Sequence, residues 1–507
     1  MDYLVGVDVG TQGTKTVIYD RDGRAIAEAF QKSNLVYGSG GRVEEDPQEL
    51  LASCLKTIKQ NIERADINNT DIAAVALDGQ MAGIMGIDTA GNNVTPYDSW
   101  LDQRCAKYFD MIRRAGEERY MQIGGGSPVT YAHGPKILWW KHEKPEAYAK
   151  IAKFVPPAVY CVMQMCGLNA ERAYIDHTYL HFAGFASVEK KEWSGELLDT
   201  FGLDPEKFPR IVKPWNIAGR VTKQMAEASG LAEGTPVAAG CGDTAASAFG
   251  AGVTHPGVLY DVGGTASTLA GAVDRFIPDI GKKMLIYPAA VVDGLYTPMA
   301  YMNGAGMCIN WFKDNVLSGG YQYSYDELNC AIEKIEPGSE NLLFIPHYAG
   351  RVCPNSQNLR GAWLRLNWNH TKAHMYRSIM ESIGYEYKIY LNRIRELIPE
   401  QEYGRILAVG GAAKSPQFRK IKADILGLTE ATISRTDTAT LAGAVIGGYA
   451  VGLFNDLSVT IHSINKECGV TEPDMENHRK YRPFINAYER SLELMDGCFS
   501  EINQILE

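Results

Sequence analysis

A single carboxylate, Asp243, stands where a predicted strand meets a predicted helix near the middle of the chain. Residues 236–239 predict a short buried strand, and the small residues after Asp243 predict a tightly packed helix. A helix start offers unpaired N–H groups and a positive dipole end, which favour an anion. A carboxylate beside such an anion site suits a base for a hydroxyl in phosphoryl transfer. A purely structural role is the alternative, because aspartate is a preferred N-cap residue.

Glycine-rich turns follow predicted strands at three other places, namely residues 10–13, 263–265 and 410–412. Backbone N–H groups in such turns can hold phosphate, since no side chain blocks its approach. Any one of these turns has a purely geometric explanation. Together, and spread over two similar halves of the chain, they favour a nucleotide held between two lobes.

Two charged residues flank the first of these turns. Lys15 follows the turn and is able to reach a terminal phosphate, although an outward-facing strand lysine is an equal alternative. Asp8 lies within an apolar strand, where an unpaired charge is costly. A Mg²⁺ ion would offset that cost, and so would a hydrogen bond to the adjacent turn. Asp8 is therefore a candidate metal ligand.

An aromatic ring, a carboxylate and a guanidinium lie close together at Trp100, Asp102 and Arg104. Such a set suits stacking on a polyol and hydrogen bonding to its hydroxyls. An ordinary surface ion pair between Asp102 and Arg104 is the alternative. The spacing alone does not decide between these two interpretations.

The elements that must position these residues form two similar halves. Strands at residues 3–9, 16–19 and 25–30 predict an antiparallel meander, followed by a helix from Pro47 and a strand at 73–77. The second half begins again at residues 258–268, where Asp, glycine and Thr follow in the same order as at 7–14. Internal similarity of this kind indicates duplicated lobes.

Composition sets limits on the class of protein. The length of 507 residues predicts two domains, and a net charge of −10 argues against nucleic acid or an anionic membrane as the main partner. The 10 cysteines are dispersed without metal-ligand spacing, so a reduced, cytoplasmic protein is expected. No signal peptide is visible. No apolar run approaches the roughly 20 residues of a membrane span.

Taken together, these residues resemble the FGGY family of carbohydrate kinases over nearly the whole chain. The segments that carry the resemblance are 8–15, 135–140, 242–245, 346–361, 370–374 and 410–416. The chain departs from the family at Arg365, where glycine is usual, and at Thr438, where glutamate is usual. The resemblance implies an α/β fold with two actin-like (ribonuclease-H-like) lobes and a central cleft. The lobes would span residues 1–250 and 251–455, with a helical extension at 456–507.

The resemblance also implies a role for each candidate residue. Asp243 would be the catalytic base, and Asp8 and Asp243 would hold Mg²⁺. ATP would be bound by Gly10, Thr11, Lys15, Gly264, Thr265, Gly306, Asn310, Gly411, Ala412 and Ser415. The sugar would be bound by Asp78, Gln80, Met81, Trp100, Asp102, Arg104 and Thr244.

We therefore expect ATP-dependent phosphorylation of a sugar hydroxyl. Gln80, Met81 and residues 100–105 are most similar to the ketopentose kinases of the family, the xylulokinases in particular, so a ketopentose such as xylulose is expected. Asp78 and Ala82 stand where xylulokinases usually carry serine and histidine. Another ketose or a polyol, such as ribulose, erythrulose or a glycerol-like compound, is therefore an alternative. A small sugar or polyol is the expected partner, and a homodimer stays open.

Two other classes of protein remain as alternatives. An actin- or chaperone-type ATPase would share the glycine turns but would need no sugar site. A nicotinamide oxidoreductase would rest only on the loose fingerprint formed by Gly240, Gly242 and Ala245. That match lies far from the N-terminus and places an acid where a pyrophosphate would approach, so we interpret it as a look-alike.

Overall fold

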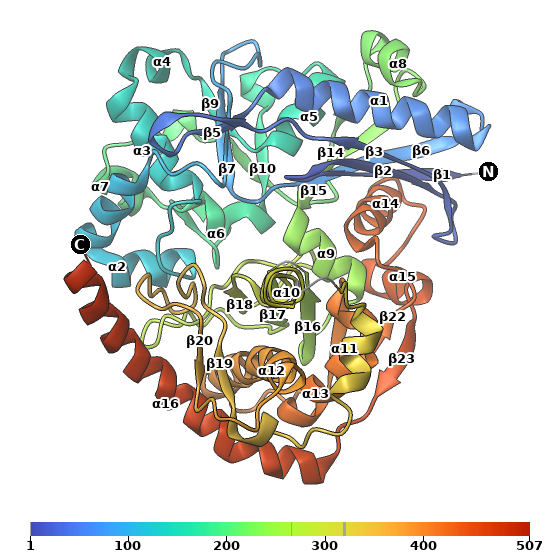
Figure 1. Cartoon of the computed structure of the whole chain (residues 1–507). Helices are drawn as coiled ribbons and strands as arrows, with labels where there is room; N and C mark the ends of the chain where they lie inside the picture. The colour runs from blue at the N-terminus through green and yellow to red at the C-terminus, as the bar shows by residue number, and fades with distance from the viewer. Residues whose placement is uncertain (1, 265, 318–320, 507) are drawn as a thin grey trace.

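The computed structural model describes residues 2–264, 266–317 and 321–506. These residues form two α/β lobes, one above the other in Figure 1, each built on a six-stranded sheet. The blue-to-green first half of the chain forms the upper lobe, and most of the yellow-to-red second half forms the lower lobe. The predicted two-lobed α/β architecture is confirmed.

The two six-stranded sheets have the same strand order and the same strand directions. The first has the order β14-β15-β6-β1-β2-β3, and the second has the order β23-β22-β21-β16-β17-β18. In each, an antiparallel meander is joined by two parallel strands and closed by an antiparallel edge strand. The predicted duplication is therefore visible in the topology.

Where a strand was predicted, its bounds lie close to the observed ones, whereas β14, β17, β18, β22 and β23 were not predicted. The first sheet consists of β1 (Tyr3–Val9), β2 (Gly13–Tyr19), β3 (Ala25–Lys32), β6 (Ile72–Gly79), β14 (Ile217–Arg220) and β15 (Pro236–Gly242). The second consists of β16 (Val258–Gly263), β17 (Ser267–Gly271), β18 (Met299–Met302), β21 (Arg405–Val409), β22 (Thr429–Ile433) and β23 (Glu467–Thr471).

Helices cover both faces of the first sheet. On one face lie α1 (Pro47–Ala65) and α5 (Pro157–Cys166), whose apolar residues share a core with Val5, Val7 and Val9 of β1. The other face is covered by α9 (Asp243–Ala251) and α14 (Thr438–Ala450). Because β1 is covered on both faces, it is apolar along nearly its whole length, as is typical of a central strand.

The remaining elements extend the two lobes. The first lobe adds α2 (Ala106–Gly124), α3 (His133–Glu143), α4 (Pro145–Lys150), α6 (Leu180–Ala183), α7 (Gly195–Thr200), α8 (Lys223–Ser229) and a sheet of β4 (Val36–Tyr37), β5 (Val43–Glu45), β7 (Gly83–Ile87), β8 (Tyr97–Ser99) and β9 (Lys153–Val155). The second adds α10 (Ala305–Trp311), α11 (Tyr325–Ala331), α12 (Lys372–Leu397), α13 (Pro416–Leu426), α15 (Leu457–Ile464) and α16 (Met475–Leu506). The red helix α16 runs along the outside of the lower lobe (Figure 1).

Two expectations from composition can be compared with the structure. All ten cysteines are free thiols, in agreement with the predicted reduced state. Within the described residues, we find no helix with the length and apolar character needed to cross a membrane.

Helix α14 lies in the second half of the chain but packs on the sheet of the first lobe (Figure 1). A Cβ atom added at Gly6 of β1 would lie 1.8 Å from the carbonyl oxygen of Thr440. One added at Gly250 of α9 would lie 1.9 Å from the carbonyl oxygen of Thr438. The first turn of α14 therefore fits against β1 and α9 only because both positions are glycine. The predicted lobe boundaries after residues 250 and 455 stay predictions.

Replacing Gly250 with alanine is expected to destabilise the protein, because the new methyl group would overlap the Thr438 carbonyl. Overpacking of this kind commonly costs about 1–3 kcal/mol, measurable by denaturant unfolding. Gly497→Ala in α16 is the matched control. Nothing lies within 4 Å of its added Cβ, so helix propensity should leave stability unchanged or raise it. A Gly250→Ala variant as stable as the parent would contradict this packing.

Candidate active site

Three carboxylates meet where the parallel strands of the first sheet end. Asp8 of β1 stands in register with Asp78 of β6, and Asp78 stands in register with Cys241 of β15. Asp243 follows β15 as the first residue of α9. The sheet thus brings together Asp8 and Asp243, which were predicted to hold Mg²⁺, and Asp78, which was predicted to bind the sugar.

A β-bulge at Gly240 sets the position of Asp243. The register between β15 and β6 shifts between Ala238 and Cys241, and Gly240 adopts a φ of +75°. A Cβ atom at this position would lie 1.7 Å from the carbonyl oxygen of Leu77. Bulges bend a strand and redirect the residues that follow, so glycine here is needed to present Asp243.

Asp243 is held by its neighbour in the first turn of α9. Its Oδ1 accepts hydrogen bonds from the Thr244 backbone N–H at 2.6 Å and the Thr244 hydroxyl at 3.2 Å. The N-cap residue is Gly242, which has no side chain. The alternative that Asp243 is the N-cap residue is therefore wrong. Thr244 orients the carboxylate, whereas its predicted contact with sugar stays a prediction.

Burial makes these carboxyl groups unusually basic. It raises the pKa of Asp243 to about 6, against the lowering effect of the Thr244 hydrogen bonds. Burial and the nearby charge of Asp243 raise the pKa of Asp8 to about 7. Burial and the charge of Asp8 raise the pKa of Asp78 well above its usual range. Desolvation disfavours the charged form of each acid, and for Asp8 and Asp78 the neighbouring acids add to that effect.

The donor set of these carboxylates fits a divalent cation. Asp8 Oδ1 and both carboxylate oxygens of Asp78 are buried and accept no hydrogen bond from an N–H or hydroxyl donor. Carboxylate oxygens are the protein ligands that Mg²⁺ prefers. No group of three or more histidine, cysteine, aspartate or glutamate side chains with the arrangement of a metal centre occurs in the described parts of the chain. Mg²⁺ does not need three such side chains, because two carboxylates can hold it while water and phosphate oxygens supply its other ligands.

A chain of hydrogen bonds joins the first glycine turn to the predicted sugar side. Trp100 Nε1 donates to Thr11 Oγ1 at 2.8 Å, and Thr11 Oγ1 donates to Gln80 Oε1 at 3.2 Å. Gln80 in turn donates to Glu45 at 3.1 Å. Met81 is also nearby, since a Cβ at Gly242 would lie 2.4 Å from its Cγ. The structure therefore brings Thr11, Gln80 and Trp100 together, and Met81 packs against Gly242, the residue before Asp243.

Asp102 and Arg104 belong to a buried charge network. Arg104 contacts Asp98, Asp102 and Glu44 at 2.7–2.8 Å, and its guanidinium lies 4.4 Å from the ring centre of Trp139. The Asp102 side chain also accepts the Val43 N–H at 2.8 Å. Asp102 is 2% exposed, so the alternative of a surface pair is wrong. The network holds the loop that carries Trp100. A direct contact of Asp102 and Arg104 with sugar stays a prediction.

The first glycine turn is a tight hairpin beside Asp8. Gly10 and Gly13 exchange backbone hydrogen bonds at 3.1 and 3.3 Å. Lys15 is the antiparallel strand neighbour of Asp8, and its ammonium forms an ion pair with Glu28 at 3.2 Å. Its side chain is 35% exposed. The contact with Glu28 agrees with the outward-facing alternative for Lys15, and its role toward phosphate stays a prediction.

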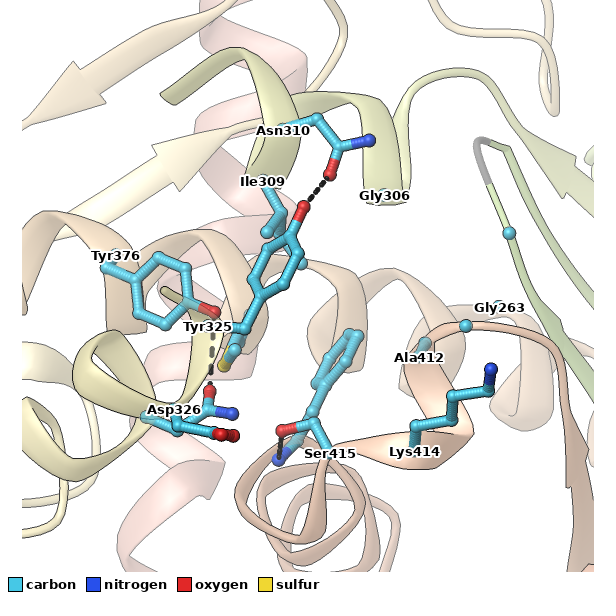
Figure 2. A pocket seen from close by; sticks show the side chains of 15 residues that line it. Gly263, Gly306, Ile309, Asn310, Tyr325, Asp326, Tyr376, Ala412, Lys414 and Ser415 are labelled. Carbon is cyan, nitrogen blue, oxygen red and sulfur yellow. Dashed lines mark hydrogen bonds between the residues drawn. The ribbon is translucent and has the colours of Figure 1, made fainter. Parts of the chain in front are cut away.

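The second lobe contains a cavity of about 470 Å³ (Figure 2). Six residues predicted to bind nucleotide line it: Gly264, Gly306, Asn310, Gly411, Ala412 and Ser415. Two of the glycine turns form one wall, since a Cβ at Gly410 would lie 2.6 Å from the Gly263 carbonyl oxygen. Thr265, also predicted there, lies outside the described residues.

Several lining residues of this cavity were not predicted. Tyr325 of α11 donates a hydrogen bond to Asn310 Oδ1 of α10 at 2.5 Å, and Tyr376 donates to Asn329 Oδ1 at 3.3 Å (Figure 2). The others are Ile309, Asp326, Met380 and Phe418, whereas Gly263 and Lys414 also line the cavity but lie in segments that were marked in the sequence, 263–265 and 410–416. Most of the unpredicted residues are single residues on separate helices, without a motif that would mark them. The cavity combines aromatic and apolar walls with a few polar groups, which suits a nucleobase.

The first lobe also contains site residues that were not predicted. Glu45 and Tyr97 both bind Gln80, and Lys136 donates to the Asp102 carbonyl at 2.8 Å. Lys136 lies in the segment 135–140 that carries the resemblance, so this signal was present in the sequence. Glu45 and Tyr97 lie on short strands, β5 and β8, which the sequence pattern did not reveal.

The chain matches two family models. Residues 3–250 match the N-terminal domain of the FGGY family of carbohydrate kinases, and residues 262–451 match its C-terminal domain. Two relatives from Bacillus subtilis are a xylulose kinase and a gluconokinase. The first is 24% identical over 96% of both chains, and the second is 24% identical over 99% of this chain and 97% of the relative.

Solved structures agree with this assignment. The ligand-bound xylulose kinase from Lactobacillus acidophilus superposes with a TM-score of 0.90 and 23% identity, covering 99% of this chain and 100% of that one. At this identity the likeness shows the fold, which is the two-lobed actin-like fold of such kinases. The family models cover most of the chain. This protein belongs to the FGGY family of carbohydrate kinases.

Proposed function

We propose that this FGGY kinase transfers the terminal phosphoryl group of ATP to a hydroxyl of a ketopentose, with xylulose as the first candidate. The observation that carries the proposal is Asp243, a buried carboxylate with a pKa of about 6 at the start of α9. A base of this kind is ionised near neutral pH yet basic enough to accept a hydroxyl proton. The residue before Asp243, Gly242, packs against Met81, which follows Gln80 of the Trp100–Thr11–Gln80 chain. Relatives named xylulose kinase support the choice of sugar.

In the proposed reaction Asp243 accepts the proton of the attacking hydroxyl. Its Oδ1 is occupied by Thr244, so we assign Oδ2 to the sugar. The sugar oxygen forms a bond to the γ-phosphorus as the bond to the β–γ bridging oxygen breaks, and ADP leaves. Gln80, Met81 and Trp100 would orient the sugar, while Arg104 and Asp102 would contact it or hold the Trp100 loop. Positioning supplies much of the rate in such transfers.

The nucleotide would extend from the cavity of the second lobe to the first glycine turn. Its adenosine would lie against Gly306, Asn310, Gly411, Ala412 and Ser415, with Gly264 and Thr265 near the phosphates. Gly10, Thr11 and Lys15 would face the terminal phosphate. Asp8, with Asp243, would hold Mg²⁺, which when bound offsets phosphate charge.

Gluconate and other ketoses or polyols form a second group of candidate substrates. One specific observation favours them: Ala82 is 9% exposed beside the site, where an imidazole would supply a hydrogen-bonding group that a methyl lacks. A relative named gluconokinase covers nearly the whole chain. Sugar-dependent ADP release, screened over xylulose, ribulose, erythrulose, glycerol and gluconate, separates these substrates from each other. It also separates a kinase from an ATPase without a sugar substrate.

Asp243→Asn is expected to retain the fold and nucleotide binding but to lose sugar phosphorylation. Loss of a general base typically lowers the rate by about 10²–10⁴. The measurement is sugar-dependent ADP release, with nucleotide affinity determined separately by calorimetry. Asp274→Asn is the matched control, because that carboxylate is 65% exposed and should leave turnover unchanged. Near-parent turnover of Asp243→Asn would refute its assignment as the base.

The pH profile of kcat/KM should show an acid limb. The pKa of Asp243 is raised, so the base form is present above about 6 and is lost as the pH falls through that value. Burial raises the pKa of Asp243, and the Thr244 hydrogen bonds only partly offset it; Asp8 of β1 and Asp78 of β6 are the titratable groups beside it. Initial rates at subsaturating sugar, with saturating ATP, measure the limb. A profile that stays flat from neutral pH down to about 4 would contradict a base with this pKa.

Ala82→His is expected to raise kcat/KM for D-xylulose relative to the other sugars. The added imidazole would offer a hydrogen-bonding group beside Gln80 and Met81, and a site that pairs a given hydroxyl discriminates strongly for it. Ala115→His, on an exposed position of α2, is the matched control. If the parent already prefers D-xylulose over every other sugar tested, the idea that Ala82 shifts the preference away from it is wrong.

A further inference from the structure

We propose that Asp8 and Asp78 together bind a divalent cation without nucleotide, so that the metal site exists before ATP arrives. The inference rests on the proposed function, since it concerns the same reaction centre. It gives Asp78 a role as a second carboxylate ligand, in place of the sugar contact that the sequence resemblance implied.

Strand register places the two carboxylates side by side. Asp8 and Asp78 are direct partners in the parallel pairing of β1 and β6. Side chains in register on neighbouring strands project to the same face of a sheet. Asp78 is 0% exposed, and neither of its oxygens nor Asp8 Oδ1 accepts a hydrogen bond from an N–H or hydroxyl donor. The two carboxyl groups lie in hydrogen-bond contact with each other. Asp8 is partly exposed, so the pair is reachable from its side.

The second lobe shows how the same fold neutralises buried acids when no ligand is needed. Asp261 of β16 corresponds to Asp8 in the matching topology, and its strand neighbours are Leu269 and Ala408. Lys422 of α13 forms buried ion pairs with Asp261 and with Glu430. The Tyr387 hydroxyl also donates to Asp261, at 2.6 Å. The second lobe thus supplies a positive charge, that of Lys422, to its buried acids.

The first lobe, as far as the structure describes it, has no cation in direct contact with Asp8 or Asp78, although Lys15 is close enough for its charge to act on Asp8. In the described part of the chain, no lysine or arginine forms an ion pair with Asp8 or Asp78, and the nearby Lys15 is paired with Glu28. Two adjacent buried carboxylates without a cation are costly to ionise. A hard cation such as Mg²⁺ or Mn²⁺ would compensate both charges. Mg²⁺ is commonly held by one or two carboxylates and keeps several waters, which phosphate oxygens can later replace.

The test is a titration of the full-length protein with Mn²⁺ in the absence of ATP and sugar, followed by the electron paramagnetic resonance signal of free Mn²⁺. The parent should show saturable binding. Asp78→Ser should weaken it by about tenfold or more, since loss of even an outer partner of a ligand often costs 10–100-fold. Glu45→Gln is the matched control. It removes another buried carboxylate of the same lobe while its carbonyl can still accept from Gln80, so Mn²⁺ affinity should not change.

The melting temperature is a second measurement, which serves if an Asp78 variant folds poorly. Mg²⁺ that binds the native state raises the melting temperature. This rise should be present in the parent and in Glu45→Gln, and reduced in both Asp78→Ser and the isosteric Asp78→Asn. Absence of Mn²⁺ binding by the parent, or parent-like affinity in the Asp78 variants, would overturn the inference. If the Asp78 variants changed the sugar preference but kept parent-like Mn²⁺ affinity, Asp78 would be assigned to the sugar site instead. Sugar-dependent ADP release by the parent tests the proposed function independently.

Discussion

The structure depends on the burial of carboxylates that the protein itself does not neutralise. Asp8 and Asp78 end adjacent strands of a sheet that is covered on both faces, and neither oxygen of Asp78 accepts a hydrogen bond from an N–H or hydroxyl donor. Water cannot solvate them fully, so their charged forms are disfavoured. Packing elsewhere must offset this cost. The apolar face of α1 and the close approach of α14 to β1 supply burial on the two sides of the same strands.

The duplicated lobes use one topology for two tasks. In the second lobe Lys422 neutralises Asp261 and Glu430, and the ends of the parallel strands open onto a cavity with aromatic and apolar walls. In the first lobe the corresponding edge keeps its acids and bends at Gly240 to present Asp243. The backbone is thus nearly the same, whereas charge and local register differ. In the function that we propose, those differences separate binding of the nucleobase in the second lobe from phosphoryl transfer in the first.

Local sequence signals predicted much of this arrangement. Alternating and continuous apolar runs predicted β1 and β15, and glycine pairs marked Gly264, Gly411 and Ala412 of the cavity, whereas Gly306, Asn310 and Ser415 came from the family resemblance. Contacts between residues far apart in the sequence could not be predicted in this way. The spacing left open whether Asp102 and Arg104 form a surface pair, because their partners Asp98 and Glu44 become close only after β5 and β8 pair. Similarly, the Asp261–Lys422 contact joins residues 161 positions apart, and no local pattern encodes it.

The threonine hydroxyl between Trp100 and Gln80 has a thermodynamic consequence. Thr11 Oγ1 accepts from an indole on the sugar side and donates to an amide, while its backbone belongs to the turn assigned to phosphate. A hydroxyl carries only one proton to donate, so a ligand that displaces either partner changes the energy of the other contact. Linkage then requires reciprocity. Whatever factor the sugar imposes on nucleotide affinity through Thr11, the nucleotide imposes on sugar affinity in equal measure.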